Sequence, residues 1–294
     1  MPAVSGLAIA VGPELIAVGL PVLAGEATDQ LFHSAVPVGR MGEFALFQLN
    51  DWLLGAATVS LAPTLEAVTH QLYLCLFSAL DGRHLARIWN YVPAINEPGA
   101  DGLENYRAFC RGRSLAFEKI YGTGFKALLP AGSAVGSKSS ELTVIFAACT
   151  ARPRHVENPL QLPAADYPAA YGPRPPSFAR ATVVATATGA RVFISGTAAI
   201  RGHATVAPED TAAQLTCTLE NLRAISLACD LGTALDGGAR TERHFKVYGR
   251  HPGEQPLIAA RLSTDLLRAG DHVAYLHADI CRADLNVEIE VTVF

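Results

Sequence analysis

Two glutamates near the end of the chain stand two positions apart in a strongly alternating stretch. Residues 285–294 read LNVEIEVTVF, in which Leu, Val and Ile alternate with Asn, Glu and Thr. Successive side chains of a β-strand point to opposite faces, so Glu288 and Glu290 share one polar face. On a face turned to water they would be ordinary surface charges. On a face that lines a pocket, burial would make Glu288 a tunable proton donor or acceptor near neutral pH.

Cationic and aromatic side chains gather in three other segments, which we expect to be loops and strands rather than helix faces. They are Tyr106, Arg107, Arg111 and Arg113; Tyr171, Arg174, Phe178 and Arg180; and His244, Lys246 and Tyr248. A guanidinium group matches a carboxylate with two hydrogen bonds. Any single arginine is better explained by a surface ion pair of small energetic value. Three clusters together with the glutamates favour a pocket for a small molecule with two carboxylates.

Other kinds of catalytic centre are not indicated by the sequence. His203 follows an expected strand, but a turn histidine more commonly binds the backbone. No histidines or carboxylates have the spacing of metal ligands, so no metal is expected. The sequence contains neither a GxSxG motif nor a strand–GxGxxG–helix motif. Six cysteines without a CxxC pair indicate reduced, mostly buried thiols, and Cys281 is the one that we consider for a functional role.

Composition excludes several classes of partner. The chain has 294 residues and a formal net charge of −4, with no basic run that would bind nucleic acid or anionic lipid. Its apolar stretches are interrupted well before the ~20 residues of a membrane span. The N-terminus lacks the basic region of a signal peptide. We therefore expect a cytoplasmic protein with no nucleic-acid or membrane partner.

The elements that would position the candidate residues follow one plan twice. Alternating or three-and-four-residue apolar spacing predicts strand, strand, helix, strand, helix, strand in each half. In the first half these elements cover residues 43–49, 57–61, 63–80, 86–91, 96–120, where a loop leads into the helix, and 142–148. In the second half they cover 182–187, 191–197, 208–232, 243–248, 256–267 and 273–278, and a further strand at 285–294 completes the sheet. The proline-rich segment 152–180 between them is a linker or an ordered active-site loop. The plan predicts an internal duplication, with domains at 1–150 and 151–294.

Seven sequence motifs, in this order, resemble those of the chorismatases. They are NYVPAIN (90–96), YRAFCRGR (106–113), YGTG (121–124), YGPRPPSFARA (171–181), SGTAAIRGH (195–203), HFKVYGRHP (244–252) and ADICRADLNVEIE (278–290). Chorismatases remove pyruvate from chorismate in secondary metabolism. The family uses a YjgF/RidA-like (chorismate mutase-like) fold twice in one chain. The resemblance therefore implies an α+β protein made of two fused βα repeats, in agreement with the duplication.

The resemblance also implies roles for individual residues. Glu288 would be the catalytic acid on the enolpyruvyl group, with a pKa raised further if Glu290 or Asp279 lies close. Cys281 stands where the members that form 3-hydroxybenzoate have a cysteine and the hydrolytic members have an alanine. The motifs that line the chorismate pocket include Tyr106, Arg113, Tyr171, Arg180 and Lys246. The expected reaction converts chorismate to 3-hydroxybenzoate and pyruvate without cofactor or metal.

Alternatives to this reaction stay open on the sequence. A hydrolytic chorismatase would give 3,4-dihydroxycyclohexa-1,5-diene carboxylate, and a third branch gives 3- and 4-hydroxybenzoate together. A RidA-like imine deaminase or a non-catalytic binding protein would use an arginine after a strand, for which Arg201 is the candidate. RidA-like folds are often homotrimers, but a doubled chain satisfies part of that arrangement internally, so a homotrimer or a monomer is expected.

Overall fold

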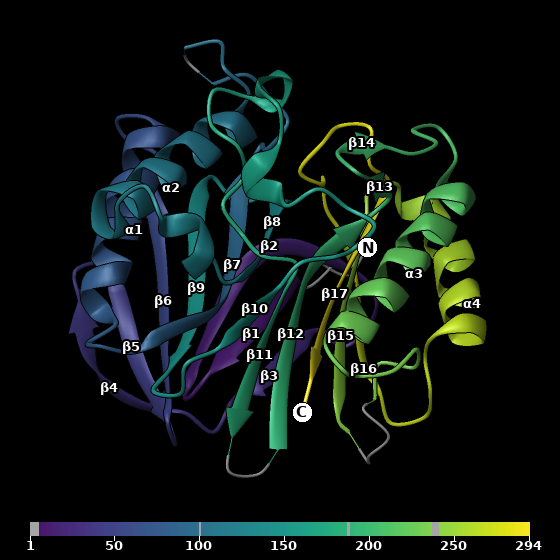
Figure 1. Cartoon of the computed structure of the whole chain (residues 1–294), viewed down its shortest axis with the longest axis horizontal. Helices are drawn as coiled ribbons and strands as arrows, with labels where there is room; N and C mark the ends of the chain where they lie inside the picture. The colour runs from purple at the N-terminus through teal and green to yellow at the C-terminus, as the bar shows by residue number, and fades with distance from the viewer. Residues whose placement is uncertain (1–5, 100, 187–188, 237–240) are drawn as a thin grey trace.

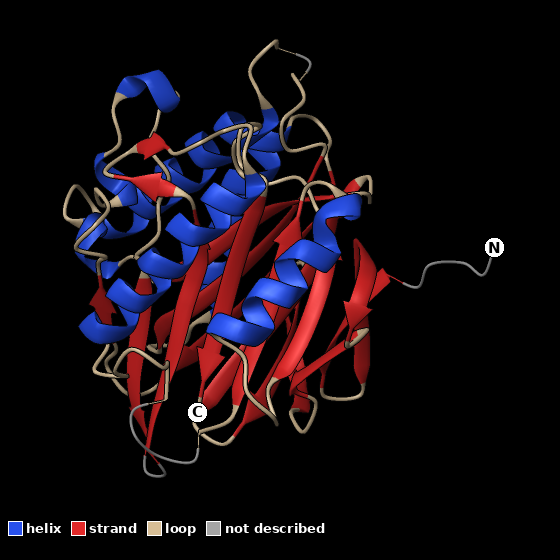
Figure 2. Ribbon diagram, turned by 90° about the vertical axis from the view of Figure 1, so that its right-hand side faces the viewer, coloured by secondary structure: helices blue, strands red, loops and turns tan. Residues whose placement is uncertain are grey.

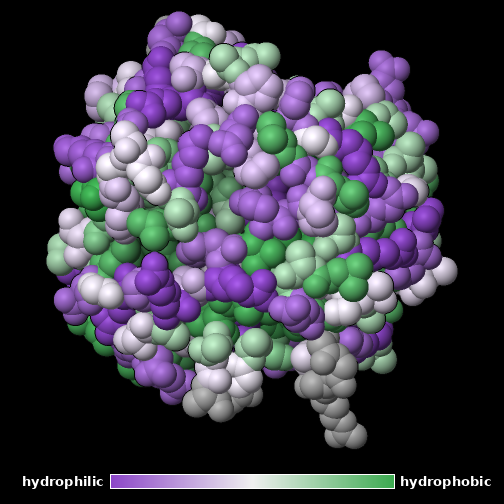
Figure 3. Space-filling view, in the orientation of Figure 1, coloured by the Kyte–Doolittle hydropathy of each residue, from purple (hydrophilic) through white to green (hydrophobic). Residues whose placement is uncertain are grey.

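The computed structural model describes residues 6–99, 101–186, 189–236 and 241–294, which form four layers (Figure 1). Two β-sheets face each other in the middle, and two helices cover the outer side of each (Figures 1 and 2). The α+β class predicted from the sequence is confirmed. Polar and apolar side chains are interspersed over the face seen in Figure 3. Among the described residues, none of the helices has the length and apolar character needed to cross a membrane.

The first sheet packs against helices α1 (Leu65–Ala79) and α2 (Asn105–Tyr121). Its strands, in spatial order, are β4 (Val36–Met41), β5 (Phe44–Leu49), β6 (Trp52–Ser60), β9 (Glu141–Cys149), β7 (His84–Pro93) and β8 (Ala131–Ser137). The first helix begins where Thr64 accepts a hydrogen bond from the N–H of Ala67, which satisfies one free backbone donor. Its buried face, including Leu72 and Leu76, then turns towards the sheet.

The second sheet packs against helices α3 (Thr211–Ala228) and α4 (Gln255–Asp265). Its strands, in spatial order, are β10 (Arg154–Val156), β11 (Ala181–Thr186), β12 (Gly189–Ala198), β17 (Val287–Val293), β15 (Arg243–Gly249), β16 (His272–His277), β2 (Glu14–Gly25), β1 (Gly6–Val11) and β3 (Thr28–Phe32). A separate hairpin is made by β13 (Ile200–Arg201) and β14 (Ala204–Thr205). The predicted apolar stripe of α3, which runs from Leu215 to Ile225, is buried in the core of this layer.

The duplication predicted from the sequence is present in the strand order. The first sheet contains β5-β6-β9-β7-β8 and the second contains β11-β12-β17-β15-β16, which is the same order in chain sequence. The parallel pair β7–β8 corresponds to the parallel pair β15–β16. Strand β8 was missing from the predicted elements, because Val135 is the single β-branched residue of its sequence AGSAVGS, which has no aromatic residue.

The N-terminal segment departs from the predicted division of the chain. Strands β1–β3 do not join the first sheet but extend the second one, through pairing of β2 with β16. The chain up to β3 therefore belongs to the second sheet, the chain from β4 to about residue 150 belongs to the first sheet, and the remainder returns to the second sheet. Such long-range pairing leaves no local signal in the sequence. Residue 187, the last of one predicted strand, lies outside the described residues.

Strand β17 shows how its alternating sequence is used. The apolar positions Val287, Ile289 and Val291 pack in the core beneath α3 and α4. The alternate positions Glu288 and Glu290 therefore face the other sheet, and both side chains are buried. The two glutamates stand inside the molecule, between the two halves, and not on a solvated face.

Two segments differ from the expected local structure. The run from Tyr106 to Arg113 was expected in a loop leading into a helix, but it lies within α2 itself. The proline-rich segment is ordered and holds β10 and the 3-10 turns Ala164–Asp166 and Ala169–Tyr171. Two further 3-10 turns lie at Phe125–Leu128 and Pro252–Glu254.

Candidate active site

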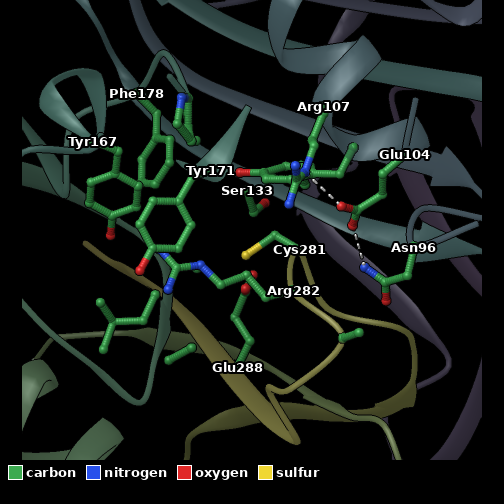
Figure 4. Close-up of a pocket in the computed structure, with 18 of the residues that line it drawn as sticks. Asn96, Glu104, Arg107, Ser133, Tyr167, Tyr171, Phe178, Cys281, Arg282 and Glu288 are labelled. Carbon is green, nitrogen blue, oxygen red and sulfur yellow. Dashed lines mark hydrogen bonds and ion pairs between the residues drawn. The ribbon is translucent and has the colours of Figure 1, made fainter. Parts of the chain in front are cut away.

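A cavity of about 490 Å³ lies between the two halves, where β12 ends and β17 begins. That volume is in the range of small-molecule sites. Every predicted site residue except Lys246 lines it, namely Tyr106, Arg113, Tyr171, Arg180, Cys281 and Glu288. Figure 4 shows Cys281 and Glu288 beside the same space, with Tyr167 and Tyr171 on one side and Arg107 and Glu104 on the other.

Glu288 is the buried acid of this cavity. Its side chain is only 4% exposed, and within the described chain its carboxyl group forms no hydrogen bond or salt bridge. Burial raises the pKa of Glu288 to about 8, and the negative charge of Glu290 adds to the shift. The positive charges of Arg87 and Arg180 act in the opposite direction. The group therefore holds its proton at neutral pH and releases it close to that range, which suits a general acid.

The space around Glu288 depends on a glycine of the neighbouring strand. Gly196 of β12 also lines the cavity, and a Cβ atom at this position would overlap Oε1 of Glu288. Asp279, the second carboxylate expected to act on Glu288, instead binds Arg250 at 2.6 Å. It is not among the groups that shift the pKa of Glu288.

Glu290 stands two residues further along β17 in a dense polar network. Its oxygens accept hydrogen bonds from Arg87 (2.7 Å), Trp89 (2.9 Å), Ser133 (2.8 Å) and Lys246 (3.0 Å). Burial alone would raise the pKa of Glu290, but the charges of Lys246 and Arg87 hold it below its ordinary value. Glu290 is thus a fixed negative charge next to Glu288, and its donors tie the two sheets together.

Lys246 is not brought to the cavity, in contrast to its expected role as a substrate contact. Its Nζ lies 2.6 Å from Asp29 of β3 and 3.0 Å from Glu290, and the residue is 8% exposed. Burial alone would lower the pKa of Lys246, but these two carboxylates raise it above its ordinary value. Two carboxylates already neutralise this cation, and it forms part of the buried network rather than of the pocket wall.

Arg113 is a cation of the cavity wall that has no acidic partner among the described residues. Although it is 2% exposed, it forms no salt bridge among the described residues. Its guanidinium lies 4.9 Å from the centre of the Phe109 ring and 4.0 Å from the sulfur of Cys110. A buried charge without a counter-ion is costly, so this position favours an anionic ligand.

Arg180 forms a second cationic wall of the cavity. One of its nitrogens donates hydrogen bonds to the hydroxyl of Tyr167 at 2.7 Å and to the carbonyl of Leu162 at 3.0 Å. Its guanidinium also lies 5.2 Å from the ring of Phe178. The carboxylate of Glu157 is 4.0 Å away, at the limit of a salt bridge. These contacts fix the guanidinium in place and leave it only weakly neutralised.

Cys281 contributes a protonated thiol. Burial and the neighbouring Glu288 raise the pKa of Cys281 to about 12. A thiolate nucleophile is therefore not expected here. Tyr106 is buried as well, and burial raises the pKa of its phenol well above the ordinary value. Both side chains shape the cavity as neutral groups.

The structure adds cavity residues that the sequence reasoning missed, namely Asn96, Glu104, Tyr167 and Arg282. Arg282 stacks on Tyr171 at 4.0 Å and on Tyr167 at 5.1 Å from the ring centres, and the hydroxyl of Tyr171 lies 3.1 Å from Nδ1 of His203. On the opposite rim, Arg107, Glu104 and Asn96 form a hydrogen-bonded chain (Figure 4). Arg282 directly follows Cys281 in the ADICR motif, which is the signal that would have identified it.

Other arginines considered from the sequence are engaged elsewhere. Arg111 binds Glu66, and Arg174 binds Glu118 at 2.7 Å. Arg201 pairs with Glu220 and donates to the amide oxygen of Asn221. None of these three lines the cavity. For them the ordinary ion-pair interpretation holds, and the position expected for a RidA-like arginine is already neutralised.

Comparison with known proteins agrees with these motifs. A family model described as chorismatase FkbO/Hyg5-like, N-terminal, matches residues 31–148. A chorismatase of Streptomyces rapamycinicus is 38% identical over 97% of this chain and 88% of its own length. A 3-hydroxybenzoate synthase of Streptomyces hygroscopicus is 36% identical over 76% of this chain and 68% of its own length.

One solved structure agrees with the sequence comparisons over most of the chain. A crystal structure of a chorismatase, 35% identical, superimposes with a TM-score of 0.80 over 88% of this chain and 80% of the other chain. The Escherichia coli YjgF product, 17% identical, matches 47% of this chain with a TM-score of 0.32. The extent and identity of the full-length matches establish the relationship: this chain belongs to the chorismatase family.

Proposed function

We propose that this protein converts chorismate to 3-hydroxybenzoate and pyruvate, with Glu288 as the general acid. The observation that carries the proposal is a buried carboxyl group with a pKa near 8 and no hydrogen-bond partner in the described structure, at the wall of a cavity. An enol ether is inert until it is protonated, and such an acid is a suitable donor. Relatives named chorismatase and 3-hydroxybenzoate synthase support the choice of substrate and product.

The charges of the cavity fit a dianionic substrate. Chorismate carries one carboxylate on its ring and one on its enolpyruvyl group. Arg113 has no acidic partner among the described residues, and Arg180 has only a distant one. We assign these two guanidinium groups to the two carboxylates, since a guanidinium binds a carboxylate with two parallel hydrogen bonds. Neither Lys246 nor a metal ion is needed for this binding mode.

The proposed reaction starts with proton transfer from Glu288 to the methylene carbon of the enolpyruvyl group. The bond between ring carbon 3 and the ether oxygen then breaks, and that oxygen leaves as the ketone of pyruvate. The 4-hydroxyl oxygen bonds to carbon 3, and its proton returns to Glu288. Opening of this arene-oxide-like intermediate and loss of a ring proton give 3-hydroxybenzoate. The products together contain the atoms of chorismate, so no water is consumed.

The side chain of Cys281 supports this route over hydrolysis. The neutral thiol lies beside Glu288 and occupies space in which a nucleophilic water would otherwise stand. The hydrolytic outcome would add one water molecule and give the non-aromatic diene diol. Product identity therefore separates the two reactions.

The test is incubation of the purified protein with chorismate in water enriched in oxygen-18, followed by chromatography with mass detection. Pyruvate and unlabelled 3-hydroxybenzoate in equal amounts are expected. A diene diol would overturn the product assignment, and oxygen-18 in the phenol would overturn the internal displacement. Unchanged chorismate would refute the proposed function.

A further inference from the structure

A cluster of ionisable side chains lies apart from the catalytic cavity, at the other end of the second sheet. His244 of β15 and His272 of β16 are directly paired across the two parallel strands. Their rings stack at 4.4 Å with an angle of 12° between the planes. Glu242 lies next to both rings, and Glu26, which follows β2, lies beside His272. Glu288 pairs with Tyr248 on β15, four residues beyond His244, so the proposed reaction does not use this cluster.

The two rings direct equivalent nitrogens at one oxygen atom. Nε2 of His244 lies 2.7 Å from Oε1 of Glu242, and Nε2 of His272 lies 3.6 Å from the same atom. An ion held at 2.0–2.1 Å by tetrahedral ligands sets those ligands roughly 3.4 Å apart. The observed distances lie on both sides of that value. Because the two rings are nearly parallel, one imidazole must also tilt out of the stack before both lone pairs can point at one ion.

The hydrogen bond of His272 to Glu26 suits a role as a metal ligand. Its Nδ1 lies 2.8 Å from the carboxylate of Glu26, which accepts and does not donate, so Nδ1 carries the hydrogen. In the neutral ring the lone pair of Nε2 then faces the carboxylate of Glu242. Histidines that bind metals commonly donate their other N–H to a carboxylate in this way, which fixes the tautomer and the ring orientation.

The surroundings allow an ion to enter and to keep a water ligand. The side chains of His272, Glu242 and Glu26 are 42%, 58% and 44% exposed. A small cavity of about 20 Å³, which holds about one water molecule, is lined by both histidines and Glu26, whereas Glu242 lies outside its wall. Imidazole nitrogens combined with a carboxylate suit Zn²⁺ and similar transition metals, whereas Mg²⁺ prefers oxygen ligands.

We propose that His244, His272 and Glu242 form a binding site for a divalent transition-metal ion such as Zn²⁺, with Glu26 orienting His272. The ion joins β15 to β16, and the hydrogen bond between His272 and Glu26 links this site to the N-terminal segment. Its role is to stabilise this junction. Because none of these four residues lines the catalytic cavity, the proposal does not depend on the reaction assigned to the protein.

The test is calorimetric titration of the untagged, metal-stripped full chain with ZnSO₄, with MgSO₄ as the comparison ion. One equivalent of Zn²⁺ should bind and raise the melting temperature, and Mg²⁺ should do neither. His244→Gln and His272→Gln should each weaken Zn²⁺ binding at least tenfold and remove the rise in melting temperature. Glu26→Gln should weaken binding by about 10–100-fold while it leaves all three ligands in place.

His251→Gln is the matched control, because His251 is exposed and belongs to neither the cluster nor the cavity. It should bind Zn²⁺ as the parent does. Melting curves without metal check that each variant is folded, and since the replaced side chains are partly exposed, folded variants are expected. Absence of Zn²⁺ binding by the parent, or equal binding by the parent and both histidine variants, would overturn the proposal.

Discussion

At the scale of single residues, Glu288 and Glu290 show how partners decide the state of a side chain. Both are buried glutamates on the same face of one strand. Glu290 accepts four hydrogen bonds, two of them from the cations Arg87 and Lys246, and it stays ionised. The other two come from Trp89 and Ser133. Glu288 accepts no hydrogen bond from the described residues, and its pKa is raised to about 8, so it stays protonated at neutral pH. The pair places a proton donor next to a fixed negative charge, which keeps the proton on Glu288.

The first prediction concerns the proton itself. Glu288→Gln keeps the size of the side chain but cannot supply a proton to the enol ether, so kcat should fall by about 10²–10⁴-fold. Chorismate binding should remain close to that of the parent, because the guanidinium groups are unchanged. Steady-state kinetics and equilibrium titration with chorismate measure the two effects. Turnover at the parent rate would exclude Glu288 as the acid.

The second prediction concerns the choice of product. Cys281→Ala removes a neutral side chain beside Glu288 and leaves room for a water molecule in its place. The diene diol should then appear at the expense of 3-hydroxybenzoate, while chorismate is still consumed. Chromatographic product ratios at full conversion give the answer. Cys229→Ala is the control, because Cys229 is a buried thiol in the core of the second sheet that does not line the cavity. The same ratio in parent and Cys281→Ala would remove this thiol from the control of the product.

At the scale of elements, helix α2 provides a matched pair of arginines. Arg113 points to the cavity, whereas Arg111, two residues earlier, binds Glu66 outside it. Replacement of Arg113 by Gln should raise KM for chorismate by roughly 10–100-fold, since a hydrogen bond to a charged group contributes about 1.5–3 kcal/mol. Arg111→Gln should leave KM within about twofold, as expected for a surface ion pair. Similar changes in both variants would contradict the proposed clamp.

Strand β12 restricts the position of the Glu288 side chain on the neighbouring strand β17. Its pairing with β17 is irregular between Ile194 and Thr197, and Gly196 lies at this irregularity against Glu288. Gly196→Ala should push the carboxyl group aside, and a displacement of about 1 Å can cost 10²-fold in rate. Gly253→Ala is the control, because a Cβ there meets no other atom within 4 Å. Turnover should fall in Gly196→Ala and stay at the parent rate in Gly253→Ala. Unchanged turnover in Gly196→Ala would show that Glu288 can be displaced without loss of activity.

Elements with strong periodicity were predictable from the sequence, and weakly marked elements were not. The stripe from Leu215 to Ile225 predicted α3, and the alternation around Glu288 predicted β17 with its two faces. Strand β8 was not predicted, because its glycines, serines and alanines have little preference for strands. Its small side chains nevertheless matter for the site, since Gly132, Ser133 and Ala134 all line the cavity.

At the scale of the whole molecule, the site is a product of both halves and of the N-terminal segment. Motifs in the sequence identified most of the cavity wall, because the residues of one motif are neighbours in the chain and reach the cavity on the same segment. The motifs did not predict that the side chain of Lys246 turns away from the cavity. Its partner Asp29 belongs to β3, which is far away in the chain. Pairing of this kind is decided by tertiary structure. It converts an expected substrate contact into part of the network that holds Glu290 between the sheets.

The last prediction tests that network through the pH dependence of the reaction. The acid must be protonated, so kcat/KM of the parent should decrease as the pH rises past the pKa of Glu288, near 8. Glu290→Gln removes the negative neighbour and leaves the cations Arg87 and Lys246 in place, so the pKa of Glu288 should fall. The decrease should then begin at least about one pH unit lower. Activity should recover at more acidic pH.

Glu220→Gln is the matched control for this measurement, because Glu220 is a carboxylate outside the cavity that pairs with Arg201. Its pH profile should overlay that of the parent. Removal of one buried partner also leaves charges unpaired, so melting curves must show that Glu290→Gln remains folded at every pH used. A folded Glu290→Gln variant whose activity is reduced by the same factor at all pH values would mean that Glu290 acts through structure alone. A shifted profile with recovery in acid can arise only if the charge of Glu290 sets the proton affinity of the catalytic group.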